Sequence, residues 1–332
     1  MGDVLSDLRV RARDDNMVRI GNMAFGFSRS QRAYDDGMGG VDNMRFEYAK
    51  DSWKVAADYQ RYLTDAESRF TGTANPVLGL ASNAVSTAAE YKYGNLFFGA
   101  RGVSGAITDE GLLANDPTIS ANYEPMKLGN FSAVQSSLGW RAKKFGFTTS
   151  FGVAHESDTL LGASGTGLLG LGAAETQYLD ADAYWNLTDS VRARARATFA
   201  YTKPGVDGNA IISLSELSSN AFSVGLDSGN FSFGLSLPLS VVHGSLSYDY
   251  ADYDIVTDDE DRYDLVISNA GARNIDMGAN LREVRFNASY RQKLGEFTDG
   301  ALGFIYRVNP NNTHEFGNES IFMMKLSHRL GI

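Results

Sequence analysis

The sequence predicts an all-β protein, an antiparallel up-and-down transmembrane β-barrel of 12–16 strands. Segments of about ten residues alternate apolar and polar side chains along most of the chain. Short and long connections follow one another in turn, and aromatic residues gather towards the segment ends. A water-soluble sandwich would share the alternation, but it gives no reason for every second connection to be long.

The composition agrees with this fold class and excludes several others. The 332 residues include 35 Gly, 19 Phe and 16 Tyr but only 6 Pro, a balance that favours strands and turns. Cysteine is absent, so disulfides and thiolate metal sites are excluded. The formal net charge of -10 argues against nucleic acid as a partner. The chain has no apolar run long enough for a transmembrane helix, and we expect its export signal to be missing from this chain.

Period-two alternation places fifteen strands along the chain. They are expected at 17–28, 43–50, 53–62, 84–93, 95–102, 131–142, 144–155, 177–187, 190–202, 219–227, 230–242, 244–256, 281–294, 297–308 and 319–332. The stretch DLRVRAR, residues 7–13, would make a sixteenth.

The connections between these strands alternate in length. Tight turns are expected at 51–52, 94, 143, 188–189, 228–229 and 295–296. Long polar or glycine-rich loops are expected at 63–83, 103–130, 156–176, 203–218, 257–280 and 309–318. In an outer-membrane barrel the short turns face the periplasm and the long loops face outwards.

Arginine occupies every second position of one predicted strand, at Arg192, Arg194 and Arg196. In a strand these side chains share one face, and the apolar residues between them form the other face. The preceding strand sets Asp180 and Asp182 opposite or diagonal to the arginines. Glu283, Arg285 and Arg291 repeat this arrangement in strand 281–294. These charges would either hydrate and rigidify the barrel interior or line a passage that favours anions or grips a threaded segment.

One acidic stretch and the histidines are the other candidates for chemistry. Residues 249–264 concentrate oxygen ligands suited to Ca²⁺ or Mg²⁺, at Asp252, Asp254, Asp258, Asp259, Glu260 and Asp261. They lack the spacing of an EF-hand loop, so we expect a solvated acidic loop and no dedicated metal site. The four histidines are dispersed and no nucleophile, base and acid stand at catalytic spacing. We therefore expect neither an enzyme nor a cofactor.

Four phrases of the sequence resemble a known family. They are HESDTLLGASGTGLL (155–169), FSFGLSLPLSVVHGS (231–245), REVRFNASYRQKLGE (282–296) and the ending at 302–332. Together they are similar to the C-terminal barrel region of subtilisin-like serine peptidase autotransporters. The resemblance implies a twelve-stranded translocator in a Gram-negative outer membrane, fused to a secreted peptidase whose catalytic motifs are not in this chain.

The resemblance also implies a role for the last strand in membrane insertion. In the family this strand ends in an aromatic residue that helps insertion. Here an alternating apolar set occupies the corresponding positions, at Phe322, Met324, Leu326, Leu330 and Ile332. Ile332 stands where the family has its aromatic residue.

We expect an autotransporter translocator and membrane anchor located in the bacterial outer membrane. Residues 1–16 would be a junction or pore segment and 17–332 the barrel, whose last twelve strands span 84–332. One alternative is a free-standing porin-like channel with a charged lumen, and another is a non-conducting barrel that presents its loops for attachment. The expected partners are outer-membrane lipid and lipopolysaccharide, the outer-membrane insertion machinery, and a linked passenger or another protein.

Overall fold

The computed structural model describes most of the chain, and nearly all of that part is β-structure. The described residues are 17–29, 41–60, 75–108, 126–164, 170–207, 211–257, 263–279, 281–295, 298–312 and 317–328. Residues 1–16, predicted to hold a sixteenth strand or a pore segment, lie outside these ranges. Among the described residues, no helix is long and apolar enough to cross a membrane.

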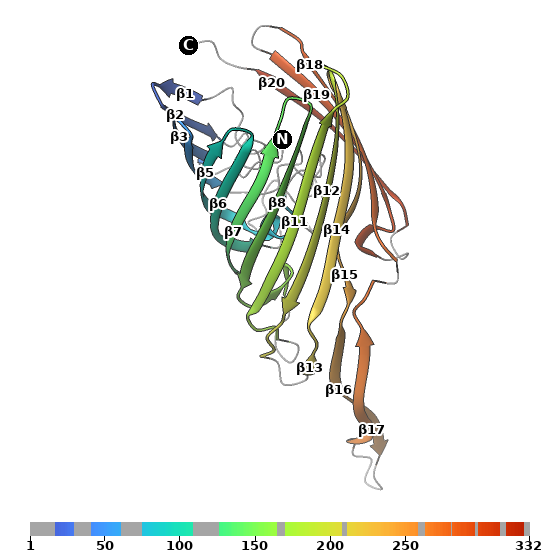
Figure 1. Ribbon diagram of the computed structural model, residues 1–332. Helices are drawn as coiled ribbons and strands as arrows, with labels where there is room; N and C mark the ends of the chain where they lie inside the picture. The colour runs from blue at the N-terminus through green and yellow to red at the C-terminus, as the bar shows by residue number, and fades with distance from the viewer. Residues whose placement is uncertain are drawn as a thin grey trace.

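Fifteen strands form one continuous antiparallel sheet, which we call the barrel wall, and each pairs with its neighbours along the chain. They are β1 (Met17–Ile20), β2 (Met23–Arg29), β3 (Val41–Lys50), β4 (Trp53–Gln60), β5 (Ser82–Tyr93), β6 (Leu96–Thr108), β7 (Lys127–Arg141), β8 (Phe145–Glu156), β11 (Ala174–Asn186), β12 (Val191–Lys203), β14 (Leu217–Ser228), β15 (Phe231–His243), β18 (Val284–Lys293), β19 (Thr298–Val308) and β20 (Glu319–His328). The wall curls along its whole length (Figure 1). The predicted all-β up-and-down fold class is confirmed.

The two ends of the wall differ in the length of their connections. Tight turns join the hairpins β3–β4, β5–β6 and β14–β15, and they contain Asp51, Gly94 and Gly229 at positive φ. Glycine adopts this left-handed backbone without a steric penalty. The other end carries the long connections, including a small hairpin of β9 (Thr159–Leu160) and β10 (Ala163–Ser164) and the 3-10 turns η2 (Leu78–Leu80) and η4 (Pro310–Asn312). We call these the short-turn end and the long-connection end.

The prediction of one strand over residues 17–28 is wrong. The structure has a hairpin there, with β1 paired to β2 from Met17 opposite Gly26 to Ile20 opposite Met23. Gly21 has a φ of 59°, and with Asn22 it reverses the chain. Gly-Asn is a common two-residue hairpin connection, so the turn signal was present inside the alternating stretch.

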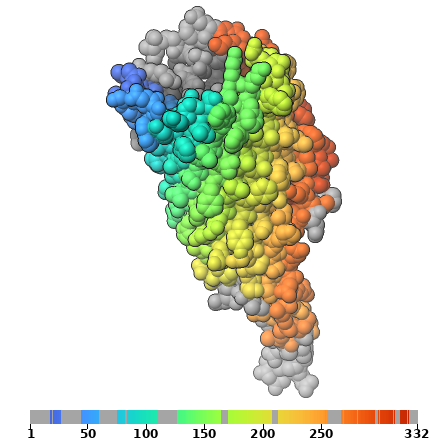
Figure 2. All heavy atoms as spheres, viewed as in Figure 1, coloured from blue at the N-terminus to red at the C-terminus, as the bar shows by residue number. Residues whose placement is uncertain are grey.

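The prediction of a wall strand at 244–256 followed by a loop at 257–280 is also wrong. β16 (Ser245–Thr257) pairs with β17 (Tyr263–Asp276), and β13 (Ile211–Leu214) adds to β16, in a separate sheet. This three-stranded ribbon projects beyond the long-connection end of the wall (Figures 1 and 2). β15 leads into it through Gly244, where a Cβ would lie 2.2 Å from Leu217 Cδ2.

Arg282 fastens the base of the ribbon to the wall. Its Nη1 donates to Asn220 Oδ1 at 2.6 Å, and its Nη2 donates to the carbonyl oxygens of Asn220 at 3.0 Å and Pro238 at 3.3 Å. Burial lowers the pKa of Arg282 from its usual value. An arginine stays protonated in proteins, so these bonds remain charge-assisted.

The outer face of the wall is apolar from one side to the other. Large exposed side chains on it include Phe25, Phe46, Phe98, Leu138, Phe147, Leu179, Phe199, Val224, Phe233, Phe286, Leu302 and Phe322. All three tryptophans of the chain also lie on this face, within two residues of a short turn. Trp53 opens β4, and Trp140 and Trp185 lie one residue before the ends of β7 and β11. Their side chains are 55%, 37% and 59% exposed.

Candidate functional site

The inner face of the wall carries the charged residues that the alternation predicts there. On β12, Thr198, Ala200 and Thr202 are buried whereas Phe199 and Tyr201 are exposed. Even-numbered residues therefore point inwards, and they include Arg192, Arg194 and Arg196. We call the space that this face surrounds the lumen.

Arg196 makes the most enclosed contact of the three. Its Nε and Nη2 donate to Asp180 Oδ2 at 3.1 and 2.9 Å, and Thr198 Oγ1 donates to Asp180 Oδ1 at 2.6 Å. Asp182 lies directly opposite Arg196 in the register of β11 and β12. Asp180 is buried, so this cluster belongs to the packed inner surface of the wall and is little exposed to the lumen.

Arg194 and Arg192 are more accessible and have other partners. Arg194 Nη2 lies 2.8 Å from Asp227 Oδ1 on β14, and Ser232 Oγ donates to the same oxygen at 2.6 Å. Arg192 Nε donates to Asn186 Oδ1 at 2.7 Å, and its guanidinium carbon lies 5.2 Å from the centroid of the Tyr184 ring. The sequence pattern indicated Asp180 and Asp182 as partners and missed Asp227, because β14 carries it as an isolated acidic residue at the strand end.

A second charged cluster lies on β18, β19 and β20. Glu283, just before β18, is buried and accepts hydrogen bonds from Arg307 Nε at 2.7 Å and Arg307 Nη2 at 3.0 Å. It also pairs with Arg285, and Arg307 pairs with Glu319. Arg291 lies on β18 and is exposed. The predicted set on strand 281–294 lacked Arg307, whose isolated position in an apolar strand gave no signal.

The inner face of β3–β8 is lined by charged and polar groups that are not among the predicted site residues. Arg141 binds Glu90 through two hydrogen bonds of 2.9 and 2.8 Å. Arg45, 1% exposed, pairs with Glu47, which also lies 3.3 Å from Lys54 Nζ. Their signal was present in the sequence, because each is the polar member of an alternating strand.

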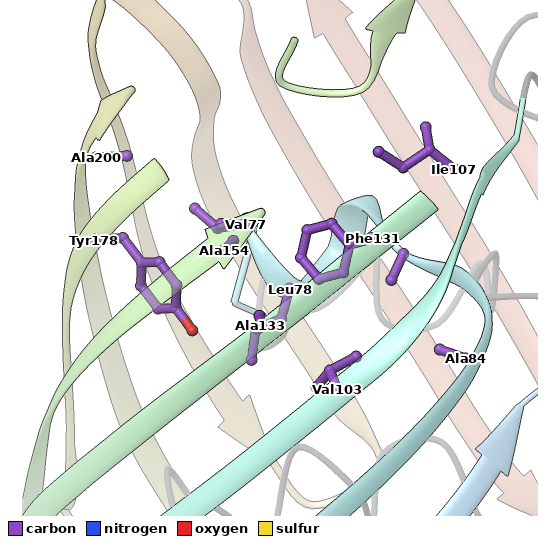
Figure 3. Packing of buried hydrophobic residues seen from close by; sticks show 11 residues of the cluster. Val77, Leu78, Ala84, Val103, Ile107, Phe131, Ala133, Ala154, Tyr178 and Ala200 are labelled. Atoms are coloured by element: carbon purple, nitrogen blue, oxygen red, sulfur yellow. The ribbon is translucent and has the colours of Figure 1, made fainter. Parts of the chain in front are cut away.

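Residues 75–81 fold inwards and cover part of the inner face of β5–β8, β11 and β12. Asn75 Oδ1 accepts hydrogen bonds from the backbone N–H of Val77 at 2.9 Å and of Leu78 at 3.1 Å, which fixes the turn into η2. Val77, Leu78 and Ala81 are at most 1% exposed. They pack with inward side chains of β5–β8, β11 and β12, namely Ala84, Val103, Ile107, Phe131, Ala133, Ala154, Tyr178 and Ala200 (Figure 3). Leu239 of β15 packs against the same cluster.

The inner face differs between its two sides. The β3–β8 side is filled by apolar packing and buried ion pairs, whereas the β12–β19 side has half-exposed arginines and carboxylates. The sequence predicted residues 63–83 as one long loop, and it did not predict the inward packing of residues 75–81. The signal was the apolar run Val77–Ala81 at the end of an otherwise polar connection.

The other predicted site residues are dispersed or lie outside the described ranges. Asp252 and Asp254 lie exposed on β16 of the ribbon, and residues 258–261 are not among those described. No group of three or more acidic or histidine side chains in the described part of the chain could hold a metal ion. Phe322 and Met324 of β20 point outwards at 77% and 83% exposure, Leu326 also belongs to β20, and Leu330 and Ile332 lie beyond the described ranges.

Comparisons with known proteins identify no family for this chain. No family model matches it, and no curated protein sequence does. Among solved structures, the outer-membrane expressed OmpT of Vibrio cholerae is similar, with a TM-score of 0.39 and 11% identity over 78% of this chain and 76% of that chain.

Proposed function

We propose that this chain is an integral β-barrel of the bacterial outer membrane that passes small hydrophilic solutes through a charge-lined lumen. The proposal that the chain lies in a membrane rests on its outer face. A continuous apolar surface there ends at the short turns in Trp53, Trp140 and Trp185. Soluble monomers rarely expose contiguous apolar patches larger than a few hundred Å². Tryptophan and tyrosine favour the membrane–water interface, so the short-turn end would lie at headgroup level.

The height of the apolar surface fits a bilayer. On β12 the outward set runs from Val191 to Tyr201. These ten steps cover about 33 Å along the strand at ~3.3 Å per residue, and about 25 Å of height at a tilt of roughly 40°. Outer-membrane barrels have an apolar band of about this height.

The charged side chains of the inner face support the proposal that water and ions pass through the lumen. Arg192, Arg194 and Arg285 are half-exposed there, and the paired carboxylates of Asp227 and Glu283 lie beside them. Segment 75–81 packs against inner side chains of β5–β8, β11 and β12, so the passage would run beside it along β14–β19. Rings of charged side chains set selectivity in pores of this kind.

A role as an autotransporter translocator is a separate proposal. Neither the outer face nor the charged inner face favours it over a channel. The resemblance to autotransporters implies twelve strands, whereas the described wall has fifteen, and β1–β4 continue it without interruption. A linked passenger, the outer-membrane insertion machinery and lipopolysaccharide stay predicted partners. The absence of enzymatic activity in this chain likewise stays a prediction.

The proposal is tested with the purified, refolded chain. A folded barrel should migrate differently on a gel before and after boiling, and should float with liposomes in a density gradient. Liposomes that contain it should swell in an isotonic solution of a small sugar and not in one of a large dextran. A chain that stays in solution without detergent and does not float would contradict the membrane assignment.

A further inference from the structure

A basin at the short-turn end of the wall shares Arg192 and Asp227 with the charged inner face described above and adds lysines that the passage does not use. It has a volume of about 740 Å³ and lies between the turns that join β7 to β8, β11 to β12 and β14 to β15. Lys143, Lys144, Asp189, Arg192 and Asp227 supply its charged lining. Ligand sites usually have volumes of this order, roughly 300–1,000 Å³.

Hydrogen bonds to backbone carbonyls hold the three turns together around the basin. The N–H of Asn186 donates to the carbonyl of Lys144 at 2.8 Å, and Asn186 Nδ2 donates to the carbonyl of Lys143 at 2.6 Å. The N–H of Gly229 donates to the carbonyl of Ser190 at 3.1 Å. The lysines are thus positioned through their backbone, which leaves both ammonium groups available.

The basin has a surplus of positive charge. Lys143 and Lys144 are exposed, and within the described residues neither forms an ion pair. Arg192 is half-buried and held by Asn186 through Nε, so its two terminal nitrogens can serve a ligand. The basin has two acidic lining residues, Asp189 and Asp227. Arg194 already pairs with Asp227, so among the described lining residues Asp189 is the carboxylate that has no ion pair.

We infer that this basin binds a small polyvalent anion carrying phosphate or sulfate groups. Two ammonium groups and a guanidinium fork supply charge-assisted donors, and phosphate oxygens accept several such bonds at once. The anion could be a free solute at the lumen mouth or the headgroup of a lipid, because Leu187 and Trp185 beside the basin point outwards. Equilibrium binding needs no conduction, so this inference stands apart from the proposed channel.

Calorimetric titration with inorganic pyrophosphate tests the inference, using the full chain in a zwitterionic detergent at low salt. We expect one site per chain. Arg192→Gln and the double variant Lys143→Gln with Lys144→Gln should each weaken binding by about fivefold or more, since charge-assisted bonds to phosphate are lost. Arg192→Lys should be intermediate, because it keeps the charge and loses the bond to Asn186.

Lys127→Gln is the matched control, because Lys127 is exposed on β7 at the opposite end of the wall. It should bind pyrophosphate as the unaltered chain does, and the gel shift on boiling checks that every variant is folded. No binding by the folded chain, or an equal loss in Lys127→Gln, would overturn the inference.

Nanodiscs distinguish the two sources of the anion. If a lipid headgroup occupies the basin, pyrophosphate should bind more weakly in discs with phosphatidylglycerol than in purely zwitterionic discs. If a free solute is the ligand, the affinity should be the same in both after correction for surface charge. Binding without conductance would remove the channel proposal and leave the anion site intact.

Discussion

Arg196 and Asp180 form a two-point ion pair diagonally across β11 and β12, although Asp182 is the residue directly opposite Arg196 in the register. The two side chains are 9% and 4% exposed. Arg194, one step along the same face, pairs instead with Asp227, and those side chains are 18% and 35% exposed. Neighbouring arginines of one ladder therefore differ in environment, and we expect them to differ in role.

Arg196→Gln should destabilise the barrel more than Arg194→Gln. Removal of Arg196 leaves the buried Asp180 carboxylate without its cation, which costs about 3 kcal/mol of unfolding free energy. Loss of the more exposed Arg194–Asp227 pair costs about 1 kcal/mol or less. Urea unfolding in micelles, followed by tryptophan fluorescence, measures both. The double variant Arg196→Gln with Asp180→Asn should recover part of the loss, and equal effects of the two single variants would refute the distinction.

Ala288→Arg and Ser289→Arg should have opposite consequences although the positions are adjacent. Ala288 is on the outer face of β18 opposite Phe233, and Ser289 is on the inner face opposite Ser232. An arginine on the lipid face near mid-membrane costs about 2–4 kcal/mol, whereas lumen positions tolerate charge. Folding yield into liposomes, read from the gel shift, should fall for Ala288→Arg alone. Similar yields for both variants would mean that the outer face of β18 does not contact lipid.

Replacing Arg192 and Arg194 together by Gln should shift ion selectivity towards cations. The change removes two positive charges from the lumen and leaves Asp227 without its arginine partner. The reversal potential across a bilayer in a salt gradient measures the shift. Arg273→Gln is the control, because Arg273 lies on the ribbon outside the wall, and an unchanged reversal potential in the double variant would leave these arginines only a structural role.

Glu156→Gln should loosen the small hairpin at the long-connection end. Glu156 is fully buried at the end of β8 and accepts hydrogen bonds from Thr159 Oγ1 at 3.0 Å and from the N–H groups of Leu161 at 3.1 Å and Gly162 at 2.9 Å. The amide can keep at most part of this set, and each weakened bond to a charged acceptor costs about 1.5–3 kcal/mol.

Hydrogen exchange at the amides of Leu161 and Gly162 checks this. Both should exchange faster in Glu156→Gln, whereas Glu175→Gln, an exposed carboxylate on β11, should leave them unchanged. Unchanged protection in Glu156→Gln would show that other contacts hold the hairpin.

The fold class and the inward set of charges could be predicted from the sequence, because period-two alternation is a local property of each strand. The assignment of individual strands was less accurate. The number fifteen was reached by two compensating errors, since 17–28 contains two wall strands and 244–256 contains none. Residues 244–256 alternate apolar and polar side chains as a wall strand does, and the pattern alone does not distinguish a strand of the wall from one of the ribbon.

Contacts between segments distant in sequence could not be predicted from the alternation of apolar and polar residues. The partner of Arg194 depends on β14 lying beside β12. The inward fold of 75–81 depends on apolar side chains that β5–β8, β11 and β12 bring together only in the folded sheet. The basin at the short-turn end is formed by three turns, at residues 143–144, 186–192 and 227–229. These turns are distant in sequence, and none of them carries a motif.

Single-channel recording in a planar lipid bilayer tests the central claim most directly. The folded chain should give stepwise conductance, and replacing Val77 and Leu78 by Ser should increase the step size, because the inward segment would pack less firmly over the lumen. A chain that folds and inserts, as judged by its gel shift and flotation, and yet gives no conductance steps would contradict the proposed passage.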